Sequence, residues 1–121
     1  VGNFPSASSV GPSLTDVSQV TISIPSSPHA VMVFGDAVVR CSEPGGCFGT
    51  LVWQVSGGLT SYDQRTLNVA LLDGEELMVS VQQIVLLDSG SQELVLQMSY
   101  TGTGGALGLT PYELAAVDLG K

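Results

Sequence analysis

A chain of 121 residues with 44% hydrophobic side chains can fill the core of one domain, and a second domain is not expected. Only 12% of the residues are charged, and 11 acidic side chains against two arginines and one lysine give a formal charge of −8. Nucleic acid and anionic membranes bind clustered Lys and Arg, so both are poor partners. The low charge favours a surface covered by another protein. The longest apolar runs, such as Ala30–Phe34, are about five residues, too short to span a membrane.

Residues 1–15 are rich in Gly, Pro and Ser and have neither helical nor strand periodicity. We expect them to form a flexible, extended arm, because they lack enough large apolar side chains to offset the entropy of ordering. The folded domain is predicted to occupy residues 16–121. The arm residues predicted to bind a partner protein are Val1, Phe4, Pro5 and Val10.

Short segments of alternating apolar and polar residues follow, and turn residues separate them. Gly35-Asp36 is a candidate bulge, and Gln82-Gln83 is a candidate break within one segment. The segment TPYELAAV also fits a helical turn, but its apolar residues fit the period of a strand. The predicted fold is a single all-β, jelly-roll-like antiparallel sandwich of seven or eight strands. The predicted strands lie at Val20–Ile24, Ala30–Arg40, Cys47–Val55, Arg65–Leu71, Leu77–Leu87, Leu94–Tyr100 and Leu114–Leu119.

Some predicted strands are apolar on both faces, although a lone sandwich exposes one face of each sheet to water. QQIVLLD and ELVLQM place Val85 and Leu87, or Val95, opposite the residues assigned to the core. This pattern predicts a second buried surface. The alternative is that loops of the same chain cover these strands. The predicted core contains Val20, Ile22, Leu51, Leu67, Val69 and Leu96.

The only cysteines, Cys41 and Cys47, enclose the five residues SEPGG. Zinc needs two more ligands, and the chain offers only the single histidine. A thioredoxin-like site needs two intervening residues at the start of a helix, whereas strands are predicted here. A disulfide across a hairpin and a pair of reduced, buried thiols remain. We expect the disulfide, worth about 2 kcal/mol for so short a loop.

His29 is the single histidine, with Ser26 and Ser27 before it and Asp36 beyond it. A Ser-His-Asp triad requires these side chains to converge in space, and no G-x-S-x-G motif is present. A polar residue at the start of a strand is the expected role of His29. No catalytic residue is predicted.

Other chemistry-bearing patterns are weak. Lys121 is terminal, which argues against a lysine nucleophile, and Glu75-Glu76 lies in a predicted turn, where a solvated role is expected. The sequence TGTGGALG lacks the lysine and the helix of a phosphate-binding loop. The acidic residues do not form a calcium-binding loop pattern. Neither a cofactor nor a metal is expected.

Four aromatic residues could form a platform for sugar rings: Trp53, Tyr62, Tyr100 and Tyr112. Aromatic residues make up only 6% of the chain, and Trp53 lies in the middle of a predicted strand. Packing in the core is therefore the expected role of Trp53.

Two stretches, SLTDVSQVTISIPSSPHAVMVFGDAVV and QELVLQMSYTGTGGALGLTPYELAAVDLG, cover most of residues 13–120. Their order of strands and the closing "AVDLG" resemble the small jelly-roll, C1q/TNF-like domains of tailed-bacteriophage virion proteins, such as capsid decoration proteins and head or tail fibres. The Cys41/Cys47 pair departs from the general pattern and leaves the subfamily open.

The resemblance implies a non-enzymatic virion structural protein, a capsid decoration (cement) or head-fibre component that binds the capsid and stabilises or decorates it. Its partners would be capsid or other virion proteins and further copies in a homotrimer, on the capsid surface or a fibre. The alternative is a carbohydrate-binding or host-receptor-binding module of a tail fibre or of a secreted, extracellular protein, with glycans as partners.

Overall fold

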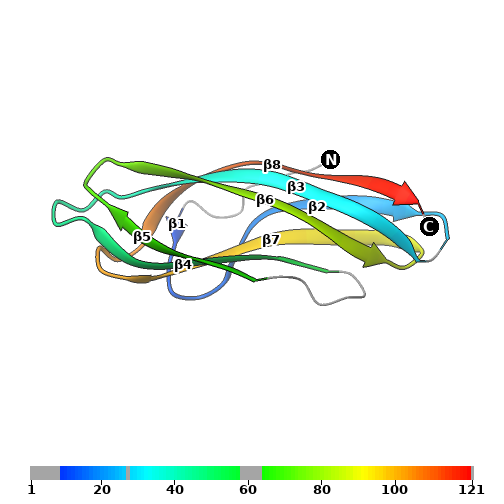
Figure 1. The fold of residues 1–121 in the computed structure, drawn as a ribbon, viewed down its shortest axis with the longest axis horizontal. Helices are drawn as coiled ribbons and strands as arrows, with labels where there is room; N and C mark the ends of the chain where they lie inside the picture. Colours follow the sequence, from blue (N-terminus) through cyan, green and yellow to red (C-terminus); the bar gives the residue numbers. More distant parts are fainter. Residues whose placement is uncertain (1–8, 27, 58–63, 121) are drawn as a thin grey trace.

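The computed structural model describes residues 9–26, 28–57 and 64–120, with the side chains of residues 111–113 outside the description. Within these ranges the chain forms eight β-strands and no helix, so no helix there could cross a membrane. The strands are β1 Ser9–Val10, β2 Thr15–Ile24, β3 His29–Arg40, β4 Cys47–Ser56, β5 Arg65–Leu71, β6 Glu76–Leu87, β7 Gly90–Gly102 and β8 Leu107–Gly120 (Figure 1).

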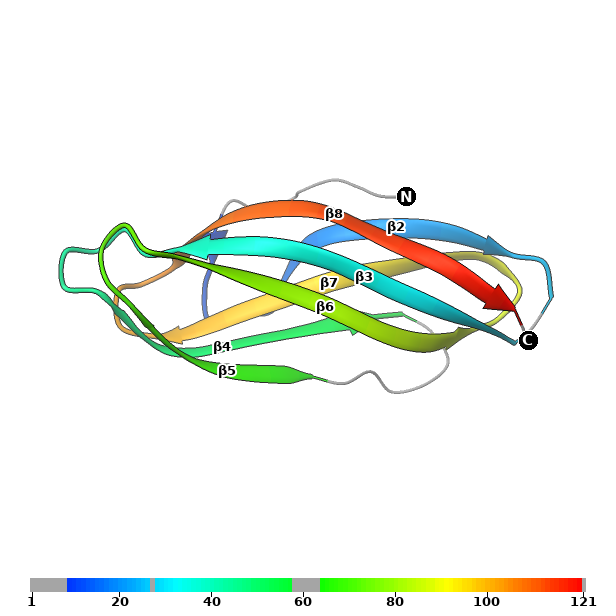
Figure 2. The ribbon, with the colours of Figure 1, turned by 45° about the horizontal axis from the view of Figure 1, so that its top comes forward.

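The strands form two four-stranded antiparallel sheets, with the orders β1-β8-β3-β6 and β2-β7-β4-β5. Of the seven connections, only β4 to β5 joins neighbours in one sheet, and each of the others crosses between the sheets. Figure 2 shows β8, β3 and β6 side by side across from β7 and β4. This order is that of an eight-stranded jelly roll, so the predicted fold class is confirmed.

The core lies between the two sheets and is formed by the side chains that the strands direct inward. Leu94, Leu96, Met98 and Tyr100 of β7 are all buried. The Tyr100 hydroxyl donates a hydrogen bond of 2.7 Å to the carbonyl of Thr103, and burial raises the pKa of Tyr100. A buried hydroxyl with a partner costs little, so the aromatic ring can fill the core.

The predicted core is largely confirmed. Val20, Leu51, Val69 and Leu96 are buried and Ile22 is partly buried. Leu67 is the exception, because 39% of it is exposed. β5 is the last strand of its sheet, so a residue near its start has no neighbouring strand on one side.

Strand β6 is apolar on both faces, as predicted, but the assignment of its two faces was wrong. Val85 and Leu87 lie in the core, whereas Ile84 and Leu86 face outward. The strand also runs unbroken through Gln82-Gln83, because β3 pairs with it along its whole length. The predicted irregularity near Gly35 is present as a register shift between β3 and β8.

The N-terminal part of the sandwich begins earlier than predicted. Ser9 and Val10 pair with Gly108 and Leu107 of β8, and Val10 is 0% exposed. The Val10 side chain is therefore part of this chain's own core and is not free to bind a partner. A two-residue strand is too short for its periodicity to appear in the sequence. Val1, Phe4 and Pro5 lie outside the described residues.

Candidate interaction surface

The outer face of β8, β3 and β6 carries a group of apolar side chains, here called the apolar face, with Asp36, Ser80 and Gln82 between its members. Cross-strand register places Ile84 opposite Met32 and Met32 opposite Val117, in a row across all three strands. Met78 and Ile84 are 59% and 57% exposed. The apolar face consists of Met32, Phe34, Val38, Met78, Ile84, Leu86, Ala115 and Val117.

A groove of about 410 Å³ indents this face between Phe34 and Ala115. Asp36, Ser80 and Gln82 contribute the polar groups of its lining. The Asp36 carboxylate accepts a hydrogen bond of 2.9 Å from the Ser80 hydroxyl. At the end of the face, Arg40 and Glu76 form an exposed ion pair of 3.7 Å. Apolar side chains lie on both sides of the polar groups of the groove, and they gain free energy when another surface covers them.

The outer face of the other sheet is more polar, although it also exposes Phe48 (46%). Amide side chains form a chain of hydrogen bonds across it: Gln64 donates to Gln54 (2.9 Å), Gln54 donates to Gln97 (3.0 Å), and Gln97 donates to Asp16 (2.9 Å). These side chains are therefore hydrogen-bond partners of one another. Only the outer face of β8, β3 and β6 therefore resembles a protein-binding surface.

The single histidine lies at the opposite end of the molecule from the disulfide, where β8 ends. The ring Nδ1 of His29 lies 2.8 and 2.9 Å from the two carboxylate oxygens of Asp118, and the Ser26 hydroxyl lies 3.2 Å from Nε2. Asp118 also accepts a hydrogen bond of 2.8 Å from the N–H of Gly120. This bond and the His29 ring lower the pKa of Asp118. An ionised carboxylate requires the proton on Nδ1, so Nε2 accepts from Ser26.

Ser26, His29 and Asp118 have the order of contacts of a catalytic triad, but with a different acid from the one the sequence offered. Asp36 bonds to Ser80 on the apolar face and does not approach His29. The groove on the apolar face and a groove beside Trp53 are lined by other residues, so neither would hold a substrate beside Ser26. The contacts do hold the end of β8 against the start of β3. Asp118 is 89 residues from His29 in sequence, and no local pattern indicates this pairing.

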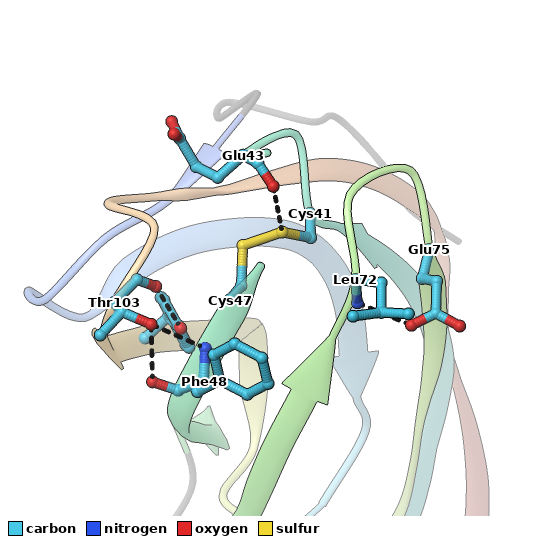
Figure 3. The surroundings of a disulfide bond; sticks show 8 residues. Cys41, Glu43, Cys47, Phe48, Leu72, Glu75 and Thr103 are labelled. Carbon is cyan, nitrogen blue, oxygen red and sulfur yellow. Dashed lines mark hydrogen bonds between the residues drawn. A yellow bond between two sulfur atoms is a disulfide. The ribbon is translucent and has the colours of Figure 1, made fainter. Parts of the chain in front are cut away.

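The predicted Cys41–Cys47 disulfide is present, with the two Cα atoms 5.8 Å apart and both side chains buried (Figure 3). The predicted hairpin is wrong. β3 pairs with β6 and β8, and β4 pairs with β5 and β7, so the bond spans a crossing from one sheet to the other. Gly46 has φ +84°, as expected of a glycine in the turn.

Neighbouring crossings hold the disulfide loop in place. The N–H of Cys41 donates to the carbonyl of Glu75 (3.0 Å), and the N–H of Gly74 donates to the carbonyl of Cys41 (2.8 Å). On the other side, the N–H of Phe48 donates to the Thr103 hydroxyl at 3.1 Å (Figure 3). Three of the crossings between sheets therefore meet at this end of the molecule.

The remaining sequence candidates are separated from one another. Tyr100 is buried and cannot stack on a sugar, Trp53 is partly buried against the core, and the side chains of Tyr62 and Tyr112 lie outside the described residues. Glu75 accepts from the N–H of Leu72 within the β5–β6 turn. No group of three or more His, Cys, Asp or Glu side chains able to hold a metal occurs in the described ranges.

Comparison with known proteins adds no relative: no family model matches the chain, and no curated protein matches it.

Proposed function

We propose that this chain is a non-enzymatic structural protein of a bacteriophage virion, a capsid decoration or head-fibre component, and that it assembles as a homotrimer through the apolar face. The observation that carries the proposal is the contrast between the two outer faces of the sandwich. One carries exposed apolar side chains on all three strands, including Met78 and Ile84, and the other is crossed by a row of hydrogen-bonded amides.

Size and charge support this assignment. The outer face of the sheet that carries the apolar face is three strands wide and follows two strands of 12 residues, so it measures roughly 15 by 40 Å with its polar residues included. Monomeric proteins rarely expose an apolar patch larger than about 300–600 Å². A chain with a formal charge of −8 repels its own copies, and contact through a face with few charges brings them together where that repulsion is smallest.

Substitution of Ile84 by Asp tests the face directly. We expect wild-type protein to sediment as a trimer at micromolar concentration and to co-sediment with capsids from the same source. Ile84→Asp places a charge beside Met32 within the apolar face and should weaken association at least tenfold. Ser23→Asp is the matched control, because Ser23 is also exposed on an outermost strand, faces outward on the polar sheet, and lies opposite Ser91.

Sedimentation velocity and particle pull-down give the readout, and circular dichroism checks that both variants are folded. A wild-type monomer that binds neither capsids nor other virion proteins would contradict the proposal. So would two folded variants that associate as well as the wild type. The alternative function is sugar binding by tyrosines in the loops, and Tyr100 cannot contribute to it because its side chain is buried in the core.

A further inference from the structure

A second groove lies on the side of the sandwich where the edge strands β5 and β6 do not pair; this side is here called the open side. β5 and β6 are each the last strand of their sheets and face each other across this side without pairing (Figures 1 and 2). The groove has a volume of about 330 Å³. It is lined by Trp53, Arg65, Ser80, Val81, Gln82 and Gln83.

The charge of this groove is opposite to that of the chain. None of its six lining residues is acidic, whereas the chain as a whole has a formal charge of −8. Arg65 is exposed and forms no ion pair with any described residue. Gln82 and Gln83 add two amide groups whose side chains make no hydrogen bond within the described ranges, so they are free to donate to and accept from a ligand.

Trp53 supplies the apolar part of the wall and an unsatisfied donor. Its indole N–H is buried and has no hydrogen-bond partner among the described residues. Buried donors normally have a partner, so this N–H requires one, which an ordered water or a bound group would supply. The register places Trp53 directly opposite Arg65, so the aromatic ring and the cation come from neighbouring positions of β4 and β5.

We propose that this groove binds an acidic saccharide, a sugar unit that carries a carboxylate. Arg65 matches the carboxylate, because guanidinium binds such groups through two parallel hydrogen bonds. The amides of Gln82 and Gln83 match sugar hydroxyls, and the indole of Trp53 matches the apolar face of the ring. Ligand pockets usually measure about 300–1,000 Å³, so a groove at the lower end fits one or two sugar rings. A phosphate group usually needs more than one cationic side chain, and this groove has only Arg65. A positively charged ligand would need a carboxylate, and none lines the groove.

Trp53 is the only tryptophan in the chain, so its fluorescence reports on this groove alone. We would titrate the full chain with N-acetylneuraminic acid and glucuronic acid, and with glucose as the neutral probe. A saturable change with at least one acid and a response to glucose at least tenfold weaker is the expected result. Arg65→Gln should weaken acid binding at least tenfold.

Arg40→Gln is the matched control, because it removes the same charge from an exposed arginine that lies outside the groove. Its affinity should stay within twofold of the wild type. Gln83→Ala should weaken binding while the melting temperature stays unchanged.

Three results would overturn the proposal: no saturable response to either acid at millimolar concentration, equal responses to acid and neutral sugars, or equal losses in the two arginine variants. The titration uses no particles, so its failure would leave the proposed virion role standing. Failure of particle binding would likewise leave the groove standing.

Discussion

His29 uses both ring nitrogens at the end of the sandwich where β8 finishes. Its contacts with Asp118 and Ser26 join the last strand to the connection between β2 and β3. Asp118 has its own anchor in the N–H of Gly120. A carboxylate stabilised in this way should make the stability of this end depend on pH.

The pH dependence of Asp118 has a defined sign. The Gly120 N–H and the His29 ring lower the folded-state pKa of Asp118, so the folded protein binds this proton more weakly than the unfolded chain. The stabilisation is present above the unfolded pKa, which is about 3.9. It should disappear as the pH falls through the lower, folded pKa.

Urea unfolding of the wild type and of Asp118→Asn between pH 2 and pH 7, about the range that brackets these pKa values, measures this effect. The wild type should be the more stable at neutral pH, and the two stabilities should converge in acid. Asp73→Asn, in an exposed turn, controls for the change in net charge. A difference between the two proteins that stays constant with pH would contradict the prediction.

Two adjacent glycines near the disulfide differ in their surroundings but not in their backbone conformation. Gly104 and Gly105 have φ of +86° and +70°. A Cβ on Gly104 would lie 2.7 Å from the sulfur of Cys47, whereas a Cβ on Gly105 meets nothing within 4 Å. Alanine at either position should cost about 1–2 kcal/mol from the left-handed conformation. Gly104→Ala should cost at least ~1 kcal/mol more, from the clash. Chemical denaturation measures both, and equal losses would show that the loop accommodates the clash.

At the scale of elements, the disulfide stabilises the passage between the two sheets. The two cysteines are six positions apart in the sequence, and for so short a loop the chain-entropy model predicts a stabilisation of about 2 kcal/mol. Reduction, or replacement of both cysteines by Ala, should lower the melting temperature by about 5–10 °C and leave the sandwich folded. Calorimetry with thiol counting under native conditions tests this. Complete unfolding on reduction would show that the crossing depends on the bond, and an unchanged melting temperature with two free thiols would show that the bond adds nothing.

The positions of the central strands were predictable to within a few residues, but β1 was missed, β8 begins at Leu107 and not at Leu114, and strand partners were not predictable. The predicted Ala30–Arg40 and Cys47–Val55 match β3 and β4 closely, because alternation and turn residues are local properties. The predicted pairing of these two strands failed. A five-residue connection between cysteines is compatible with a hairpin and with a crossing between sheets, and only the other strands decide between them.

The assignment of faces failed in β6 for a related reason. In a strand with one apolar face, the alternation itself identifies the buried side. In β6 both sets are apolar, since Val85 and Leu87 alternate with Ile84 and Leu86. The choice depends on the register with β3, whose own inward residues are Val31 and Val33.

At the scale of the whole molecule, the two sheets share one core and differ in what they show to the outside. The glutamine contacts on the β2-β7-β4-β5 sheet and the apolar face of the other sheet are consequences of the same fold. A molecule with this asymmetry has one preferred side for protein contact and a separate groove on its open side. The two grooves share Ser80, Val81 and Gln82 of β6, whereas Ile84 lines neither groove and Arg65 lines only the second, so the two variants test the two surfaces separately.

The sequence by itself determined the fold class and the approximate positions of β2 to β8, and it favoured the disulfide over a pair of reduced thiols. These features follow from local alternation, from turn residues, and from a single pair of cysteines. Only the tertiary structure decided that Val10 belongs to the core, that Cys41 and Cys47 join two sheets, and that His29 meets Asp118. Each of these depends on residues far apart in the chain, and their contacts arise from the packing of whole strands, which leaves no local mark in the sequence.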